Sequence, residues 1–197
     1  VLAQYDKLDI NKDDIQMGAV IITGETARKK NANRVLQALS GYAGDFVVAT
    51  AGPDLESIIA GKGAGAQTYS EQNGNTIVNI DVGGGTSNLA VFKNGEVIDA
   101  ACFDIGGRLI KVDSETQKVS YIAPKVQELI KEINCSIELG VKVTPEILDP
   151  IITILTTTLE NSIGIGDKNQ FYEQLITNHD LQENHEIRAI TFSGGVA

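Results

Sequence analysis

The sequence predicts an α/β protein with two lobes. The first 74 residues alternate strand, helix, strand and helix patterns, which is typical of a parallel sheet with covered faces. At Thr76 the alternation of strand and helix patterns ends. Three short apolar segments follow one another closely, which predicts an antiparallel meander. A strand pattern returns near the end, after two helical stretches. We therefore place the lobe boundary between residues 74 and 75, with lobes at residues 1–74 and 75–197.

The elements of the first lobe follow from short apolar runs. Residues 1–18 are polar and mixed in charge, and predict a linker or a short helix. Residues 19–22 and 46–50 are rich in β-branched side chains, as buried strands are. Between them, residues 27–39 carry apolar side chains at helical spacing and precede two glycines. A turn then leads into a further short helix around residues 55–60.

The second lobe combines a hairpin signal with two helix signals. Asn94-Gly95 lies between two apolar runs, and Asn-Gly is a strong predictor of a two-residue hairpin turn. Pro124 suits the first turn of a helix, whereas Pro150 predicts an interruption of a second helix. The predicted elements are strands at 77–81, 89–92 and 96–101, helices at 124–139 and 144–161, and a final strand at 187–192.

Composition excludes several classes of partner. The chain has 197 residues, 42% of them hydrophobic, and a net charge of -10, which argues against binding to nucleic acid or to an anionic membrane. No apolar run approaches the length of a membrane span. Cys102 and Cys135 are too far apart in sequence to suggest a disulfide framework, so a cytoplasmic setting is expected. His179 and His185 lack further metal ligands nearby and are expected at the surface.

The stretch NIDVGGGTSN, residues 79–88, predicts a phosphate-binding turn. A hairpin of glycines turns backbone N–H groups outward with no side chains in the way, and such donors suit phosphate oxygens. Asp81 ends the preceding strand and is a candidate ligand of Mg²⁺ through water. A glycine-rich hairpin without a ligand is the simpler alternative. The candidate phosphate contacts are Gly83, Gly84, Gly85, Thr86 and Ser87.

Two well-known glycine-rich nucleotide-binding motifs do not match this stretch. The P-loop pattern needs a lysine after its glycines, and none follows here. The dinucleotide fingerprint opens a helix, whereas this chain continues into a strand.

Longer segments resemble known families. IDVGGGTSNLAVF, IDAACFDIGG and ITFSGGVA are similar to the second phosphate loop and adenosine motif of the superfamily of actin, heat-shock chaperones and sugar kinases. TGETARK, AGDFVVATAGPDLESIIAGKGAGA and CFDIGGRLI resemble the EutA family of reactivating factors for ethanolamine ammonia-lyase. The resemblance implies an actin-like (ribonuclease H-like) ATPase fold, whose nucleotide lies in the cleft between two lobes.

The resemblance also implies roles for particular residues toward ATP and Mg²⁺. Asp81 would act catalytically through Mg²⁺ and water, and the turn that follows it would hold the β- and γ-phosphates. Two further glycine pairs follow in the chain. Gly106 and Gly107 would lie near the ribose and phosphates, and Gly194 and Gly195 would contact the nucleoside. The first phosphate loop of the superfamily has no counterpart here, so we expect a chain truncated at both ends.

The function that the resemblance implies is reactivation of a cobalamin enzyme. ATP would drive release of damaged cobalamin from ethanolamine ammonia-lyase so that intact adenosylcobalamin can bind. The expected partner is that enzyme, and the expected setting is the cytoplasm, in association with a bacterial microcompartment. The alternatives are a small-molecule kinase of the same superfamily and a filament-forming actin-like ATPase.

Overall fold

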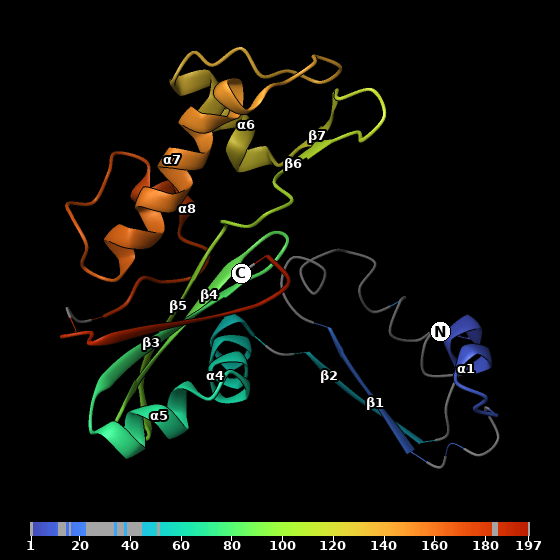
Figure 1. The fold of residues 1–197 in the computed structure, drawn as a ribbon, viewed down its shortest axis with the longest axis vertical. Coiled ribbons are helices and arrows are strands. Elements are labelled where there is room, and N and C mark those ends of the chain that lie inside the picture. The colour runs from blue at the N-terminus through green and yellow to red at the C-terminus, as the bar shows by residue number, and fades with distance from the viewer. Residues whose placement is uncertain are drawn as a thin grey trace. The chain divides into compact units, whose positions relative to one another are not determined.

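The computed structural model describes residues 2–11, 15, 17–22, 34, 38, 45–50, 52–182 and 185–196. The chain divides into two units, Val1–Gly52 and Pro53–Ala197 (Figure 1).

The first unit holds a short helix and two paired strands. Helix α1 spans Leu2–Lys7, and strands β1, Met17–Ile22, and β2, Asp45–Thr50, pair in parallel with Met17 opposite Asp45. Both strands were predicted at nearly these positions, and their parallel pairing follows the strand-helix-strand pattern. The helix predicted at residues 27–39 lies almost wholly outside the described residues.

The second unit is built on a four-stranded mixed sheet. Strands β3, Thr76–Val82, β4, Ser87–Lys93, and β5, Glu96–Phe103, form the predicted antiparallel meander. Strand β8, Ala189–Ser193, then returns parallel to β3, so the order across the sheet is β5-β4-β3-β8. This arrangement confirms the predicted α/β class.

Helices cover both faces of this sheet (Figure 1). Helices α4, Pro53–Gly63, and α5, Ala66–Asn73, pack on the face that carries Phe92, where Gly61 fits closely against the aromatic ring. The opposite face carries the larger core, in which residues such as Phe103 pack against α6, α7 and α8. Because strand side chains alternate, neighbouring residues of β3 contribute to different cores.

The segment between β5 and β8 forms a separate layer of helices and one hairpin. Its elements are β6 (Ile110–Val112), β7 (Val119–Ile122), α6 (Pro124–Glu132), α7 (Pro145–Ser162) and α8 (Tyr172–Leu175). The first predicted helix is too long by seven residues, since it ends at Glu132 and not at 139. A left-handed Asn134 with φ of 51° terminates it. Pro150 lies inside α7 and does not interrupt it, contrary to the prediction.

Helices α4 and α5 belong to the second unit, although they precede the predicted lobe boundary. They pack against β3, β4 and β5, so the unit begins at Pro53. The boundary between residues 74 and 75, which concerns the lobes of a longer protein, stays a prediction.

Both histidines of the chain anchor the segment that leads from α8 to β8. His185 was expected at the surface, but its side chain is only 9% exposed and its Nε2 lies 2.7 Å from a carboxylate oxygen of Asp99. The Nε2 of His179 lies 3.0 Å from the carboxylate of Asp54, at the start of α4. The two pairs therefore tie this segment to β5 and to α4.

Hydrogen bonding shifts the pKa values of the His179 and Asp54 pair. The backbone carbonyl of Asp180 and the carboxylate of Asp54 both accept hydrogen bonds from the imidazolium, and they raise the pKa of His179 above 6.5. Partial burial raises the pKa of Asp54, but hydrogen bonds from His179 and Asn178 outweigh it and bring the pKa below 3.8.

We expect this pair to stabilise the fold between pH 3.8 and 6.5, by about 0.5 kcal/mol or less because both side chains are well exposed. The raised pKa of His179 means that the contribution is lost as the pH rises through the folded-state value. The lowered pKa of Asp54 means that it is also lost as the pH falls through the folded-state value of that group. An NMR titration of the His179 ring should show the raised pKa.

The matched variant for this measurement is Asp54→Asn, in which the His179 pKa should fall back toward 6.5. The contact between His185 and Asp99 does not involve Asp54, so the variant leaves that pair intact. An unchanged His179 titration in the variant would show that the ion pair does not form in solution.

Candidate phosphate-binding site

Three glycine-containing segments meet at one edge of the four-stranded sheet. Strands β3, β5 and β8 run in the same direction, so their carboxyl ends lie at the same edge. The turn Gly83–Thr86 follows β3, Gly106-Gly107 follows β5, and Gly194-Gly195 follows β8. The structure thus brings together all the glycines that the sequence marked as candidate contacts.

Backbone hydrogen bonds join the turn after β3 to the loop after β5. Gly83 N–H donates to Thr86 O at 2.9 Å within the turn. Gly107 N–H donates to Gly83 O at 3.1 Å, and Arg108 N–H donates to Gly84 O at 2.7 Å. These carbonyls are therefore engaged, whereas the N–H groups of residues 84–86 donate to no acceptor within the described ranges. The turn presents consecutive donors, as the phosphate hypothesis requires.

Glycine is required where the loops touch. A Cβ on Gly106 would lie 2.6 Å from Gly84 C and from Gly85 N, so the loop backbone lies directly against the turn. On the other side, Gly194 has a φ of 101°, and a Cβ there would lie 2.3 Å from Val82 O. The loop after β5 therefore packs against the glycine turn itself, and the loop after β8 packs against Val82, directly before the turn.

A chain of hydrogen bonds orients the carboxylate of Asp81. Thr191 Oγ1 donates to Asn79 Oδ1 at 2.9 Å, and Asn79 Nδ2 donates to Ser193 Oγ at 3.1 Å. Ser193 Oγ in turn donates to Asp81 Oδ1 at 2.7 Å. The chain runs between β8 and β3 on the face covered by α4, and it holds the carboxylate at the end of the strand.

Asn88 supplies a second oxygen beside this carboxylate. It lies directly opposite Asp81 in the antiparallel pair, so both side chains occupy the same face. Asn88 is 2% exposed, and its buried Oδ1 has no hydrogen-bond partner among the residues that the structure describes. A buried acceptor without a donor is costly, and a water molecule or a cation-bound water satisfies it.

The Asp81 and Asn88 oxygens fit a hydrated Mg²⁺. Mg²⁺ favours oxygen ligands and retains several waters, which donate hydrogen bonds to nearby carboxylates and amides. Over the ranges that the structure describes, no group of three or more His, Cys, Asp or Glu side chains is placed to hold a metal directly. The donor set therefore suits a metal bound mainly by water and phosphate.

The two hydroxyl residues of the turn are more buried than their predicted role suggests. Thr86 is 6% exposed and Ser87 is fully buried. Ser87 Oγ donates to Ile105 O at 2.8 Å, a bond that fixes the loop after β5 to the start of β4. Contact of either hydroxyl with a phosphate stays a prediction.

Sequence reasoning missed three polar residues of this site. Ser193 and Asn88 join it because β8 and β4 flank β3, which local patterns do not reveal. Arg108 follows the second glycine pair, and its side chain lies against Gly84. A basic residue directly after Gly-Gly was the only signal available for it.

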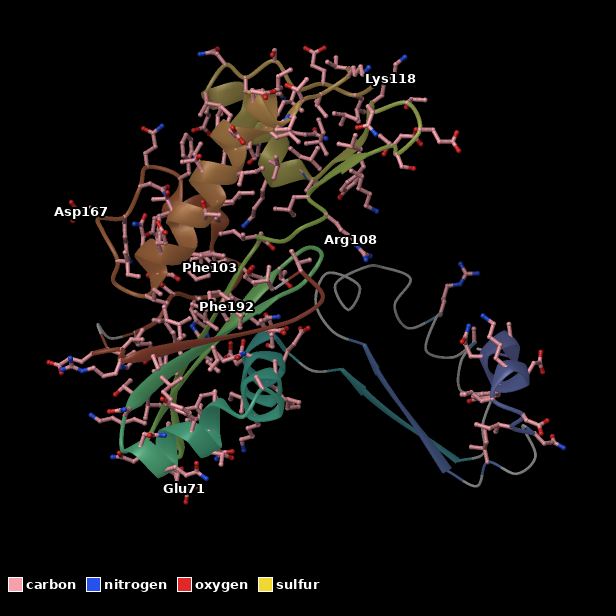
Figure 2. All side chains as sticks on the ribbon, viewed as in Figure 1. Glu71, Phe103, Arg108, Lys118, Asp167 and Phe192 are labelled. Atoms are coloured by element: carbon pink, nitrogen blue, oxygen red, sulfur yellow. The ribbon has the colours of Figure 1, made fainter. Side chains whose placement is uncertain are left out.

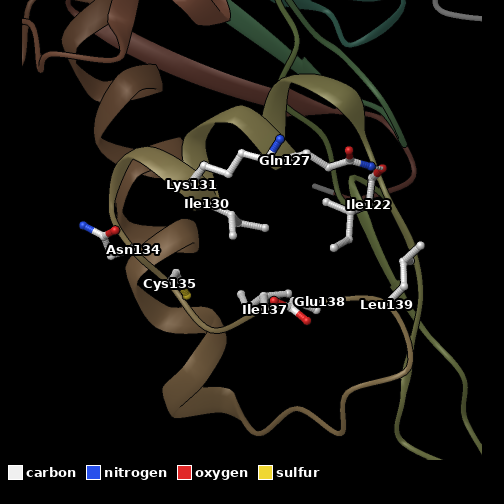
Figure 3. Close-up of a pocket in the computed structure, with 9 residues that line it drawn as sticks. All are labelled: Ile122, Gln127, Ile130, Lys131, Asn134, Cys135, Ile137, Glu138 and Leu139. Atoms are coloured by element: carbon white, nitrogen blue, oxygen red, sulfur yellow. Dashed lines mark hydrogen bonds between the residues drawn. The ribbon is translucent and has the colours of Figure 1, made fainter.

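A separate pocket of about 660 Å³ lies beside α6 (Figure 3). Ile122, Ile130 and Ile137 form its apolar surface, and Lys131 and Glu138 bring opposite charges to it. Cys135 is a free, half-buried thiol here. The pocket shares no residue with the glycine loops.

The fold and this edge of the sheet define an α/β protein with three glycine loops beside an aspartate, which is a candidate phosphate-binding site. The model of the family "Ethanolamine utilisation protein EutA" matches residues 1–197. The chain therefore belongs to the EutA family.

Curated relatives agree with this assignment. The ethanolamine ammonia-lyase reactivase EutA of Salmonella typhimurium is 40% identical over 205 residues, which cover 100% of this chain and 42% of that protein. The protein of the same name from Escherichia coli is 51% identical over 119 residues, covering 60% of this chain and 26% of that protein. The chain thus spans less than half the length of these relatives.

Solved structures show weaker similarity. A Ppx/GppA family member from Aquifex aeolicus has a TM-score of 0.40 at 15% identity and covers 84% of this chain and 42% of that chain. MreB 5 of Spiroplasma citri bound to AMPPNP has a TM-score of 0.40 at 18% identity, with coverages of 98% and 63%. EutJ from Carboxydothermus hydrogenoformans has a TM-score of 0.31 at 16% identity, with coverages of 79% and 50%.

Proposed function

We propose that this chain is the phosphate-binding part of an ATP-dependent reactivating chaperone for ethanolamine ammonia-lyase. The protein releases damaged cobalamin from that enzyme, so that intact adenosylcobalamin can bind. The observation that carries the proposal is the convergence of three glycine loops around consecutive N–H groups that have no acceptor among the described residues, beside Asp81. Membership of the EutA family supplies the partner, since both curated relatives are named as reactivases of this enzyme.

Each part of the site has a role toward ATP. The N–H groups of residues 84–86 bind phosphate oxygens, and Gly195, where a Cβ would meet nothing within 4 Å, leaves room for the nucleoside beside Gly194. Asp81, held by Ser193, and Asn88 accept hydrogen bonds from the water shell of Mg²⁺. When bound, Mg²⁺ neutralises charge on the phosphates during transfer to water.

ATP does mechanical work only if it distinguishes two arrangements of the protein. A ligand with equal affinity for both arrangements does not shift the equilibrium between them, however tightly it binds. Moving a population from 1:99 to 99:1 requires a difference of about 5.5 kcal/mol in binding free energy. We propose that these two arrangements are an open and a closed placement of the two lobes of an actin-like ATPase, and that the phosphates bind more tightly to the closed arrangement.

The proposed setting is the cytoplasm, with association to a microcompartment that handles ethanolamine. Among the helices that the structure describes, none is long and apolar enough to cross a membrane.

Reactivation is tested with the full-length protein and ethanolamine ammonia-lyase inactivated by cyanocobalamin. We expect that ATP, Mg²⁺ and fresh adenosylcobalamin restore deamination, and that omission of ATP or of the protein prevents recovery. Hydrolysis of ATP without recovery of deamination would contradict the proposal and favour the kinase or filament alternatives. Phosphorylated product and sedimentation with ATP would then separate these two.

A further inference from the structure

Arg108 is held against the phosphate-binding turn by two contacts. Its N–H donates to Gly84 O at 2.7 Å. Its aliphatic stem lies along the same residue, because a Cβ on Gly84 would be 3.2 Å from Cδ and 3.6 Å from Cγ of the arginine. Beyond the stem, the guanidinium extends away from the ribbon of the second unit (Figure 2). The backbone and the side chain therefore place a cation at the turn.

This cation is not neutralised by the part of the chain that the structure describes. No hydrogen bond or ion pair of the Arg108 guanidinium occurs there, and the residue is exposed. Other basic residues nearby are engaged. Lys125 pairs with Asp104 at 2.6 Å, and the Lys111 ammonium lies 5.2 Å from the centre of the Tyr121 ring. In a chain of net charge -10, an unpaired guanidinium beside unpaired N–H donors is selective for an anion.

We propose that Arg108 binds the terminal phosphates of a nucleoside di- or triphosphate held by the turn, and that it selects ligands by the charge of their phosphate chain. This inference rests on the proposed nucleotide-binding function. A guanidinium presents a planar fork of N–H donors that matches phosphate oxygens, and such charge-assisted bonds are stronger than neutral ones. The backbone N–H groups bind one side of the phosphate chain, and Arg108 adds the positive charge that they lack.

The alternative explanation is that Arg108 only covers Gly84 with its stem. Arg108→Gln keeps much of that stem and removes the charge, whereas Arg108→Lys keeps a point charge without the fork. Lys111→Gln removes the same charge from a side chain that packs on Tyr121, and it is the matched control. Thermal unfolding of each variant reports whether the fold is retained.

The experiment is calorimetric titration of the full-length protein and these variants with ATP, ADP and adenosine. We expect Arg108→Gln to raise the Kd for ATP about 10- to 100-fold and to leave the Kd for adenosine unchanged. Arg108→Lys should restore part of the affinity, and Lys111→Gln should match the wild type. The salt dependence of ATP binding should also become weaker in Arg108→Gln, because one ionic contact is lost.

The outcomes separate the two hypotheses. ATP affinity that is equal in wild type and Arg108→Gln overturns the role of Arg108 and leaves the proposed function standing. A loss of adenosine affinity equal to the loss of ATP affinity assigns Arg108 a purely structural role and overturns the inference. A wild-type protein that binds no nucleotide overturns the proposed function, and the inference with it.

Discussion

Gly106→Ala is expected to lower the free energy of unfolding of the second unit by about 1–3 kcal/mol, and to abolish high-affinity ATP binding by the full-length protein. The added Cβ would meet backbone atoms of Gly83, Gly84 and Gly85 at 2.6 to 2.7 Å. Backbone atoms cannot rotate aside as a side chain does, so the turn must move away from the loop. Thermal unfolding measures the first effect and calorimetry with ATP measures the second.

Gly195→Ala is the matched control, because it lies at the same edge of the sheet and a Cβ there meets nothing within 4 Å. We expect wild-type stability in this control. Gly106 does not have a positive φ, so strain from the backbone conformation does not contribute to its predicted effect. Wild-type stability and ATP affinity in Gly106→Ala would show that the loop does not rest on the turn in solution.

Asp81→Asn is expected to reduce Mg²⁺-dependent ATP hydrolysis by the full-length protein about 100-fold or more, with no change in fold. The amide oxygen of asparagine still accepts the hydrogen bond from Ser193, so the local structure is retained. The negative charge that faces the hydrated cation is lost. Turnover of ATP measured over a range of Mg²⁺ concentrations reports this loss, and circular dichroism reports the fold.

The matched control for charge removal is Asp167→Asn. Asp167 is exposed in the loop after α7, on a different part of the second unit from the glycine turn (Figure 2). Its substitution should leave hydrolysis unchanged. Wild-type turnover in Asp81→Asn would remove this carboxylate from the site and would leave the turn without a metal-facing acid.

Local sequence was sufficient for most strands of the fold. The alternation of β-branched runs with helical patterns predicted β1 and β2, and the Asn94-Gly95 turn predicted the hairpin of β4 and β5. Both turn residues have positive φ, of 52° and 83°, as this hairpin type requires. Strand and turn patterns of this kind extend over a few residues, so they can be recognised without the rest of the chain.

The end of α6 and the environment of His185 could not be predicted from such local signals. The helix after Pro124 was predicted too long, because its end depends on a left-handed Asn134 and not on a glycine. His185 was expected at the surface and lies instead against Asp99. The second error concerns a residue whose partner, Asp99, is distant in sequence.

The candidate site likewise divides into residues that the sequence predicted and residues that only the tertiary structure revealed. The sequence pattern predicted Asp81 and the glycine triplet, since a run of glycines next to an acid is unusual within a strand pattern, and the family resemblance added the other two glycine pairs. Only the tertiary structure brought Asn88, Ser193 and Arg108 to them. That assembly depends on β8 pairing with β3 and on Gly106 packing against the turn, and such contacts form between segments that no local periodicity relates.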